Sequence, residues 1–322
     1  MNLLVTGGAG YIGGTVATIL MQAGHRVTVL DNLCHSKRNE VPTGAEFVEA
    51  DIADRPRVES LLRELKPDGV LHFAALIEAG DSMRVPEVYF RNNTASTLSL
   101  LEAMHATGVN KLVFSSTAAV YGEPRSVPIE ETAPLDPTNA YGESKLLVEY
   151  MLKWFHQIHG LRYASLRYFN VAGALPHRGE AHEPESHIIP LILDVALGRR
   201  EKIFIFGDDY DTPDGTCIRD YIHVRDLADA HILALQALET RDKLVLNLGN
   251  GSGFSVKEVI ESARRVTGHA IPVEMKPRRP GDPARLVAGS EKAKAELGWK
   301  PQISEIDSIL QSAWDWQQQR YK

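Results

Sequence analysis

The sequence predicts an α/β protein that begins with a doubly wound parallel sheet and ends in a smaller α/β domain. Short apolar runs typical of strands alternate with stretches of helical periodicity up to Asn170, as expected for parallel strands joined by crossover helices. A glycine-rich turn directly follows the first apolar run, and Asp31 ends the second. Beyond Asn170 the alternation loosens, and we expect the second domain to begin there.

Composition excludes several classes of function. A chain of 322 residues is long enough for two medium domains, and its net charge of -7 argues against binding to nucleic acid. Two cysteines, Cys34 and Cys217, indicate free thiols in a reducing compartment, so we expect a cytoplasmic protein. Met1–Val5 has no basic flank and predicts no targeting peptide, and no apolar run reaches membrane-spanning length.

The first elements indicate a dinucleotide-binding unit. They are a strand, a turn with three spaced glycines, a helix and a second strand: Leu3–Thr6, Gly7, Gly10 and Gly13, Thr15–Ala23 and Arg26–Asp31. Glycines let the backbone approach a pyrophosphate, the helix N-terminus offers N–H groups, and Asp31 can accept hydrogen bonds from ribose hydroxyls. Asp31 also favours NAD over NADP, because a 2′-phosphate would face its carboxylate. Lys37 and Arg38, a few residues later, are interpreted as loop residues.

Further elements extend the predicted sheet. We expect three strands and one long helix, at Glu46–Glu49, Gly69–Phe73, Lys111–Phe114 and Met83–Met104. The last strand delivers Ser115, Ser116 and Thr117 to the carboxyl edge of the sheet, where sites form in doubly wound folds. These side chains are therefore candidates for the active site.

A tyrosine and a lysine lie four residues apart on the next predicted helix. At this spacing Tyr141 and Lys145 share one helix face. An ammonium beside a phenol lowers the pKa of the phenol, which turns tyrosine into a general acid or base. With Thr117 orienting the same oxygen and NAD accepting a hydride, the residues predict oxidation of a carbinol, as in a dehydrogenase of any alcohol.

Six motifs carry a resemblance to a known family. They are Thr6–Gly13, Asp31–Asn32, His72–Ala75, Tyr141–Lys145, Arg167–Asn170 and Arg219–Val224. Over nearly its whole length the chain resembles the extended short-chain dehydrogenases/reductases, and most of all the branch of UDP-glucose 4-epimerases. The resemblance implies a Rossmann-type domain with tightly bound NAD. It also implies reversible epimerisation at carbon 4 of a UDP-hexose, UDP-glucose or UDP-galactose, through a transient 4-keto sugar.

Motifs and resemblance together suggest which residues meet each ligand, with Thr117, Tyr141 and Lys145 as catalytic residues. Those expected at NAD are Gly7, Gly10, Tyr11, Ile12, Gly13, Asp31, Asn32, Asp51, Ile52, Phe73, Ala74, Ala75, Asn92, Ser115, Tyr141, Lys145 and Tyr168. Those expected at the UDP-sugar are Thr117, Tyr141, Asn170, His187, Phe204, Phe206, Arg219, Tyr221, Arg279, Asp282 and Leu286. Asp51 could also cap the helix that starts near Arg55, and the two roles are compatible. We expect Phe204 or Phe206 to belong to the core.

The resemblance also implies the domain plan and the partners. It gives residues 1–170 and the returning segment 220–260 to an NAD-binding domain, and residues 171–219 and 261–322 to a UDP-sugar domain. It further implies a homodimer formed through the helices around Met83–Met104 and Tyr141–Gln157.

One position in the resembling family controls the range of sugars. A bulky tyrosine there restricts the enzyme to plain hexoses, and a small residue admits N-acetylated ones. Counting from Arg279 and Asp282, this position is Leu286, although Leu286 could also be an ordinary core residue. We expect fast turnover of UDP-galactose and weak turnover of UDP-N-acetylgalactosamine.

The same fold also supports functions other than the epimerisation of UDP-hexoses. Sugar-nucleotide dehydratases carry Asp-Glu directly after the threonine, whereas this chain has Ala118 and Ala119, which cannot donate a proton. A UDP-glucuronate or UDP-pentose 4-epimerase stays open, because those sugars change only the pocket. A non-catalytic NAD-sensing regulator is disfavoured by the intact set of Thr117, Tyr141 and Lys145.

A polar stretch after Asn170 contains several histidines. His177 and His182 lie in it, and His187 follows it. Their spacing suits no zinc pattern and no cysteine accompanies them, so we interpret the stretch as a substrate-covering loop and expect no metal.

Overall fold

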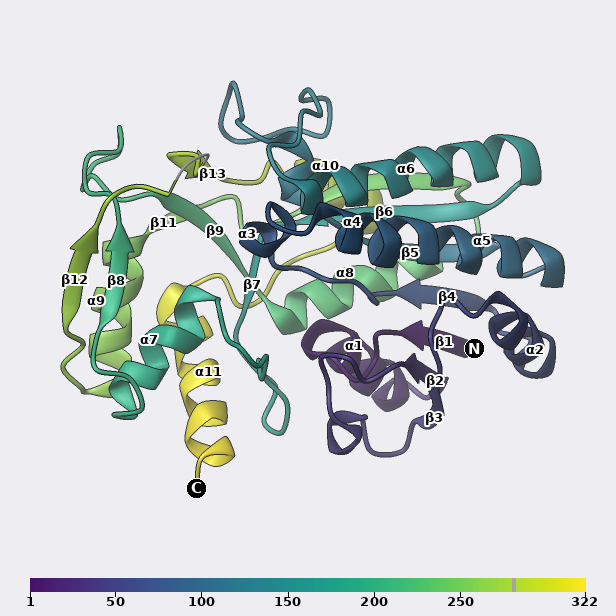
Figure 1. Ribbon diagram of the computed structural model, residues 1–322, viewed down its shortest axis with the longest axis horizontal. Helices are drawn as coiled ribbons and strands as arrows, with labels where there is room; N and C mark the ends of the chain where they lie inside the picture. Colours follow the sequence, from purple (N-terminus) through teal and green to yellow (C-terminus); the bar gives the residue numbers. More distant parts are fainter. Residues whose placement is uncertain (280–281) are drawn as a thin grey trace. The chain divides into compact units, whose positions relative to one another are not determined.

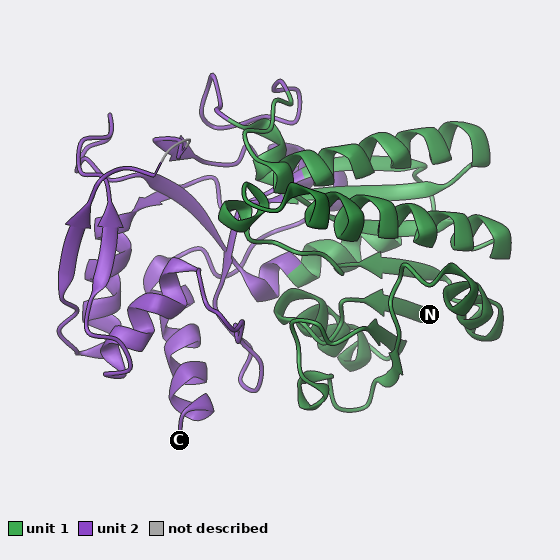
Figure 2. Cartoon of the chain, in the orientation of Figure 1, with its two compact units in different colours: residues 1–122, 135–167, 228–246 green, residues 123–134, 168–227, 247–322 purple. Residues whose placement is uncertain are grey.

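A seven-stranded parallel sheet forms the centre of the first of two units in the computed structural model, which describes residues 1–279 and 282–322 (Figures 1 and 2). The first unit comprises residues 1–122, 135–167 and 228–246; the second comprises 123–134, 168–227 and 247–322. The domains expected from the sequence were defined by the ligand that each one binds, so their boundaries stay a prediction. Pro280 and Gly281, in the expected loop before Asp282, lie outside the described residues.

The strands of the first unit follow the order β10-β6-β5-β4-β1-β2-β3. They are β1 (Asn2–Thr6), β2 (Arg26–Asp31), β3 (Glu46–Glu49), β4 (Gly69–His72), β5 (Lys111–Thr117), β6 (Arg162–Tyr168) and β10 (Lys243–Leu248). The chain winds outward from β1 to β3 on one side and from β4 to β6 on the other. The order reverses between β1 and β4, and the carboxyl ends of strands at such a reversal form the usual ligand crevice of doubly wound sheets.

Helices pack against both faces of this sheet. They are α1 (Tyr11–Gln22), α2 (Arg55–Leu65), α5 (Ser96–Thr107), α6 (Ala140–His159) and α8 (Val224–Ala237), with the short α3 (Ala79–Ser82) and α4 (Pro86–Tyr89). Apolar residues of α2, α5 and α6 share one core with Leu4, Val70 and Phe114 of the strands. Because side chains alternate along a strand, neighbours such as Leu3 and Leu71 are buried on the opposite face.

The long helix expected at Met83–Met104 is interrupted, so this expectation is wrong in part. Pro86 starts α4 after Val85, whose backbone is non-helical, because the residue before a proline avoids the α region. A π-helical segment, Phe90–Ala95, then joins α4 to α5. The segment carries Asn92 and Asn93, and such widened turns often mark functional positions.

The second unit has two small sheets and four helices in its described residues. Its elements are β7 (Asn170–Ala172), α7 (Ile188–Ala196), β8 (Ile203–Phe206), β9 (Ile218–His223), β11 (Gly253–Ser255), α9 (Val256–Thr267), β12 (Val273–Lys276), β13 (Arg285–Leu286), α10 (Glu291–Leu297) and α11 (Ile306–Arg320). One core joins α7, α9 and α11 to β8 and β9. Ser255 caps α9 through a reciprocal pair of hydrogen bonds with Glu258.

In the part of the chain that the structure describes, every helix is too short or too polar to cross a membrane.

Candidate functional site

The turn between β1 and α1 needs glycine for two close approaches. Gly7 has a φ of +70°, and a Cβ there would lie 2.5 Å from the backbone nitrogen of Ala74 at the end of β4. A Cβ on Gly13 would lie 2.3 Å from the carbonyl oxygen of Gly7. The turn therefore presses against both β4 and α1, at the point where the strand order reverses.

The N-terminus of α1 begins beside this turn. Its N-cap is Gly10, which has no side chain to cap the helix, and a Cβ there would meet no atom closer than 3.4 Å. The first turn contains no acidic side chain; Tyr11 is buried and Ile12 half-buried. A helix N-terminus of this kind attracts phosphate, because its N–H groups and dipole both favour negative charge.

Asp31 ends β2 next to the glycine turn. Its carboxylate accepts hydrogen bonds from the backbone N–H groups of Ala9 (3.0 Å) and Leu33 (2.9 Å). Burial raises the pKa of Asp31 above its ordinary value, and the two hydrogen bonds offset part of this effect. Arg38 does not face this carboxylate: it pairs with Glu49 at 3.3 Å. A carboxylate held in this way can accept hydrogen bonds from a ribose.

Asn32 and Asp51 come together from neighbouring strand ends. The amide of Asn32 donates to the Asp51 carboxylate at 2.9 Å, and Asp51 also accepts from the Ala53 N–H at 2.8 Å. The further role for Asp51 as a helix cap is wrong, because Asp54 caps α2 through the N–H of Arg57. Ile52, the residue after Asp51, is buried in the core of the first unit.

The end of β4 is held by an asparagine of the π-helical segment. Phe73, Ala74 and Ala75 are half-buried after β4. Asn93, in the π-helical segment, accepts from the Leu76 N–H at 2.8 Å and donates to the Leu76 carbonyl at 2.9 Å. Asn93 also donates to Oγ of Ser144 on α6 at 3.1 Å, whereas Asn92 donates to Asn93 at 3.0 Å. The family resemblance implies an asparagine at Asn92 or Asn93 that supports the site, and Asn93 is the one that holds this strand end.

Thr117 and Tyr141 meet where β5 and α6 approach each other. Their side chains lie close enough for Thr117 to lower the pKa of the Tyr141 phenol. A Cβ on Gly142 would lie 2.6 Å from the carbonyl oxygen of Ala119, so only glycine lets α6 come this close to the segment after Thr117. Asn139 caps α6 by accepting from the Gly142 N–H at 2.8 Å. This close approach places the phenol beside the threonine.

Lys145 lies one turn after Tyr141 and is buried. Its ammonium donates to the carbonyl oxygen of Ser115 at 2.9 Å and lies 5.0 Å from the Phe114 ring centroid. Burial lowers the pKa of Lys145 to about 7. Burial raises the pKa of Tyr141 to about 12, and Thr117 offsets part of this. Burial thus shifts the pKa of both groups against their charged forms, which for the phenol is opposite to the direction expected from the Tyr–Lys spacing alone.

In the second unit, Arg219 and Asp282 form an ion pair across β9 and the segment before β13. β13 pairs with β9 in parallel, and Leu286 lies opposite Arg219. Paired residues of neighbouring strands point to the same face of a sheet, so Leu286 lies beside the Arg219–Asp282 pair. Leu286 is half-buried and does not belong to the core of this unit.

Neither Phe204 nor Phe206 is a core residue, which corrects the expectation for this strand. Ile203 and Ile205 are the buried residues of β8, and the two phenylalanines alternate with them on the other face. The guanidinium of Arg279 lies 3.9 Å from the Phe206 ring centroid. An aromatic ring suits stacking on the base of a nucleotide, and the neighbouring guanidinium suits binding of its phosphates.

The remaining expected residues lie on two neighbouring strands of the second unit and at the end of β6. Asn170 on β7 pairs with Tyr221 on β9. Asn170 is half-buried, whereas Tyr221 is 2% exposed, and burial raises the pKa of its phenol. Tyr168 is buried at the end of β6. Of these three, Asn170 is the residue with the most accessible side chain.

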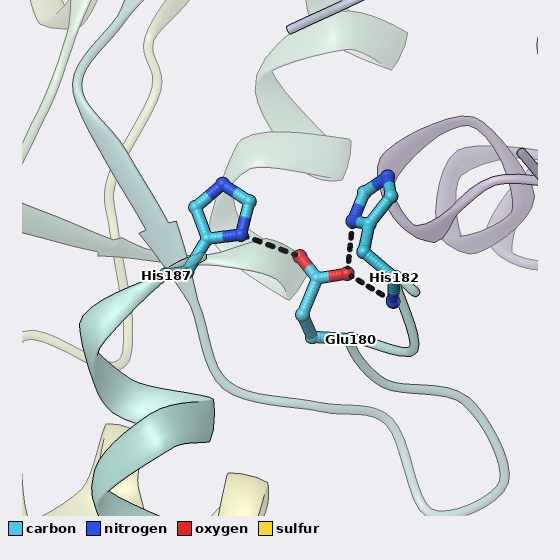
Figure 3. A group of neighbouring side chains, drawn as sticks. All are labelled: Glu180, His182 and His187. Atoms are coloured by element: carbon cyan, nitrogen blue, oxygen red, sulfur yellow. Dashed lines mark hydrogen bonds and ion pairs between the residues drawn. The ribbon is translucent and has the colours of Figure 1, made fainter. Parts of the chain in front are cut away.

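His187 lies at the start of α7 in a cluster with Glu180 and His182 (Figure 3). Nδ1 of His182 lies 2.5 Å from Glu180, and Nδ1 of His187 lies 2.8 Å from Glu185 and 3.9 Å from Glu180. Burial alone raises the pKa of Glu180, but the hydrogen bond and charge of His182 outweigh it, and the pKa lies below its usual range. Burial lowers the pKa of His187, but Glu185 and Glu180 outweigh burial and raise it.

Comparison with known proteins links this arrangement to a family. Residues 3–249 match the NAD dependent epimerase/dehydratase family. The chain is 53% identical over 314 residues to the UDP-glucose 4-epimerase of Corynebacterium glutamicum, a match that covers 98% of this chain and 95% of that protein.

Solved structures show the same similarity. A crystal structure of UDP-glucose 4-epimerase aligns with a TM-score of 0.97 and 49% identity, covering 99% of this chain and 98% of that one. The UDP-glucose-4-epimerase from Stenotrophomonas maltophila, solved with bound NAD and formylated UDP-arabinopyranose, aligns with a TM-score of 0.96 and 44% identity, covering 100% and 99% of the two chains.

Proposed function

The chain belongs to the NAD dependent epimerase/dehydratase family, and on that premise we propose that it is an isomerase that interconverts UDP-glucose and UDP-galactose at carbon 4, with NAD as cofactor. The observation that carries this proposal is the close approach of α6 to the end of β5, which brings Tyr141 beside Thr117 and Lys145 onto the carbonyl of Ser115. Family membership supplies the reaction class, and Tyr141 supplies the group that moves a proton.

The first unit offers a cradle that fits NAD. The glycine turn and the N-terminus of α1 suit the pyrophosphate, because a Cβ at Gly7 or Gly13 would strike backbone and Gly10 adds no side chain. Asp31 suits the adenine ribose, and the Asn32–Asp51 pair and Ile52 suit the adenine. The nicotinamide end would lie near Phe73–Ala75, Asn92, Ser115 and Lys145. When bound, NAD supplies a hydride acceptor and a positive charge.

The protein's own residues handle the proton and the orientation of the sugar. Tyr141 takes the proton of the 4-hydroxyl as hydride leaves carbon 4, and returns it when hydride comes back on the other face. Thr117, which lies beside Tyr141, orients the same oxygen. Because burial alone raises the pKa of Tyr141, proton transfer requires cationic charge beside the phenol. The ammonium of Lys145 contributes part of that charge.

We assign the UDP-sugar to residues of the second unit. Arg219 and Arg279 carry guanidinium groups that suit a diphosphate, and Phe204 and Phe206 suit the uracil ring. Asp282 forms an ion pair with Arg219. A bound diphosphate would replace Asp282 as the partner of this guanidinium. The same assignment includes Asn170, His187, Tyr221 and Leu286.

Two observations disfavour the other reactions. Ala118 and Ala119 follow Thr117 where a dehydratase needs proton donors, and both side chains are methyl groups. The relative from Corynebacterium glutamicum and the two solved structures described above are named UDP-glucose 4-epimerases.

A direct test needs no added cofactor. The purified protein is incubated with UDP-galactose alone, UDP-glucose is measured, and the bound nucleotide is extracted and identified. We expect turnover without added NAD and release of NAD on extraction. UDP-glucuronate and a UDP-pentose are run in parallel. Faster turnover of either, or no turnover of UDP-galactose by protein that contains NAD, would overturn the proposal.

We further propose that the protein is a homodimer. Tyr150, Trp154 and Ile158 recur every four residues on α6 and are 48%, 60% and 67% exposed, and Leu98 on α5 is 38% exposed. An apolar stripe on two helices suits a second copy of the same surface. Light scattering should give a dimer mass for the wild type and a monomer mass for Trp154→Asp. Val273→Asp, at an exposed valine of the second unit, is the matched control.

The cytoplasm is the proposed location. In the structure both cysteines are free thiols, Cys34 exposed and Cys217 buried, as expected in a reducing compartment. Measurement of protein and activity in fractionated cells tests this assignment.

A further inference from the structure

Three potential metal ligands converge in the second unit. Among the described residues, the ligand atoms of Glu180, His182 and His187 all lie within 4.8 Å of one another (Figure 3). Both imidazoles present Nδ1 to the same carboxylate: His182 at 2.5 Å from one oxygen and His187 at 3.9 Å from the other. We propose that Glu180, His182 and His187 form a binding site for a divalent transition-metal ion of the Zn²⁺ class.

The loop that carries two of the ligands is held in place by α11. A Cβ on Gly179 would lie 2.2 Å from the Trp316 ring, so the chain passes directly against this indole just before Glu180. The Trp316 Nε1–H donates to the Glu180 carbonyl at 3.3 Å, and Arg320 donates to the Ala181 carbonyl at 3.2 Å. The ligand side chains therefore project from a backbone that is already ordered, which a metal site requires.

The donor set selects the class of ion. Two imidazole nitrogens and a carboxylate oxygen are the protein ligands of many three-residue zinc sites, which keep a fourth position for water or another oxygen. Imidazole favours zinc, copper and nickel over magnesium and calcium, which prefer sites made of oxygen alone. Both Nδ1 atoms lie within 3.9 Å of the Glu180 carboxylate, so the three groups are close enough to share one ion.

A fourth residue supports this arrangement from outside the cluster. The Glu185 carboxylate lies 2.8 Å from Nδ1 of His187. A carboxylate beside a ligating histidine commonly orients the ring and raises its basicity. The carboxylates of Glu185 and Glu180 both lie near Nδ1 of His187. Glu185 is therefore also placed to supply the fourth ligand in place of water.

The spacing of the histidines along the chain pointed away from a metal, and the fold explains why. His177 is exposed and lies outside the cluster, so one of the three histidines has no part in it. Glu180 carries no signal in the sequence, because it is a lone glutamate in a loop. The site exists only because the loop folds back so that Glu180 meets His187 at the start of α7.

The test uses intact protein with its bound NAD and without a polyhistidine tag. Bound metal is first removed with a chelator, and Zn²⁺ is then titrated in competition with a chromophoric chelator. We expect one tight Zn²⁺ per chain in the wild type. His182→Ala and Glu180→Gln should each weaken binding by at least about 10–100-fold, the range seen even when only the outer partners of ligands are lost. His177→Ala, a histidine from the same loop, should bind like the wild type.

Exposed Cys34 is the main competing ligand and is controlled directly. All titrations are repeated in a Cys34→Ser background, and Co²⁺ is used as a spectroscopic substitute. We expect Co²⁺ bands without thiolate charge transfer, lost in His182→Ala and kept in His177→Ala. Circular dichroism and NAD content establish that each variant is folded. If folded His182→Ala and Glu180→Gln bind Zn²⁺ as the wild type does, or if the wild type binds none tightly, the proposal is wrong.

Discussion

Glu149 on α6 and Arg167 on β6 form a buried, two-pronged ion pair in the first unit. Arg167 donates from Nη2 to Oε2 of Glu149 at 2.5 Å and from Nε to Oε1 at 3.0 Å. Ser116 and Ser165 also donate to Oε1, at 2.6 and 2.8 Å. The pair thus ties α6 to β5 and β6. Ser116 lies between Ser115, which accepts from Lys145, and Thr117, so the network fixes the strand end that the proposed reaction uses.

Removing one partner of this pair should destabilise the protein strongly. Glu149→Leu leaves a buried guanidinium without its counter-charge, and Arg167→Met leaves a buried carboxylate. Either loss costs about 3–5 kcal/mol of unfolding free energy. The double variant Glu149→Leu/Arg167→Met leaves no stranded charge and should lose less than the sum of the two.

Urea unfolding of the four proteins tests this coupling. The exposed pair of Arg26 and Glu46, with side chains 66% and 49% exposed, is the matched control. Its removal should change stability by less than about 1 kcal/mol. Additive losses in the buried pair would show that the two charges do not act together.

Tyr141→Phe should abolish nearly all turnover while leaving NAD bound. The variant loses only the hydroxyl that accepts the proton and keeps the ring. Thr117→Ala keeps the proton acceptor and should lose less, about 10²–10⁴-fold. Turnover of UDP-galactose and the content of bound NAD are measured on the same preparations. A Tyr141→Phe variant with a near wild-type rate would remove Tyr141 from the mechanism.

Asp31 should account for a preference for NAD over NADP. Its buried carboxylate also accepts from the N–H groups of Ala9 and Leu33, so Asp31→Ala removes charge and hydrogen bonds together. Asp31→Asn removes the charge but keeps an acceptor. Both variants should narrow the difference between the dissociation constants of NAD and NADP. Tighter binding of NADP than NAD to the wild type would contradict the assignment.

Leu286 should set the discrimination between plain and N-acetylated hexoses. It pairs with Arg219, which places it next to the proposed diphosphate residues. A change in the size of an apolar wall alters discrimination by about 1–3 kcal/mol. Leu286→Tyr should abolish turnover of UDP-N-acetylgalactosamine and leave turnover of UDP-galactose unchanged. Leu286→Ser should raise turnover of UDP-N-acetylgalactosamine. An equal ratio of kcat/KM for the two sugars in all three proteins would show that Leu286 does not gate the pocket.

Lys145 should make the stability of the cofactor-free protein depend on pH. Burial lowers its pKa to about 7, against 10.5 for an ordinary lysine. Between these values the unfolded chain binds more protons than the folded one, so stability rises with pH in this window. Below about pH 7 burial of the ammonium lowers the free energy of unfolding by its full amount, and above about pH 10 it no longer lowers it.

Lys145→Met removes this dependence. Urea unfolding between pH 6.5 and 9.5 should show a rise in unfolding free energy, at most about 1.4 kcal/mol per pH unit, that the wild type has and the variant lacks. Lys153→Met, at an exposed lysine of the same helix, should behave like the wild type. Identical slopes in wild type and Lys145→Met would contradict the prediction.

The local patterns of the sequence determined the parts of the protein that depend on short spacing. The glycine turn, Asp31 and the Tyr141–Lys145 pair each lie within one strand–turn–helix unit or one helical turn. Together with the alternation of strands and helices and the other family motifs, they predicted the doubly wound fold, the family and NAD, and these predictions are confirmed. Periodicity also located most strands, because their apolar runs are short and bounded by turns.

The tertiary structure decided what depends on contacts between distant segments. The Asn93 clamp on Leu76, the Glu149–Arg167 pair and the cluster of Glu180, His182 and His187 each join side chains that no local pattern relates. The same holds for protonation: Tyr141 and Lys145 share a helix face as expected, yet burial among neighbouring elements shifts both pKa values against their charged forms. Spacing along the chain sets which residues share a face, but burial and the partners brought by folding set their chemistry.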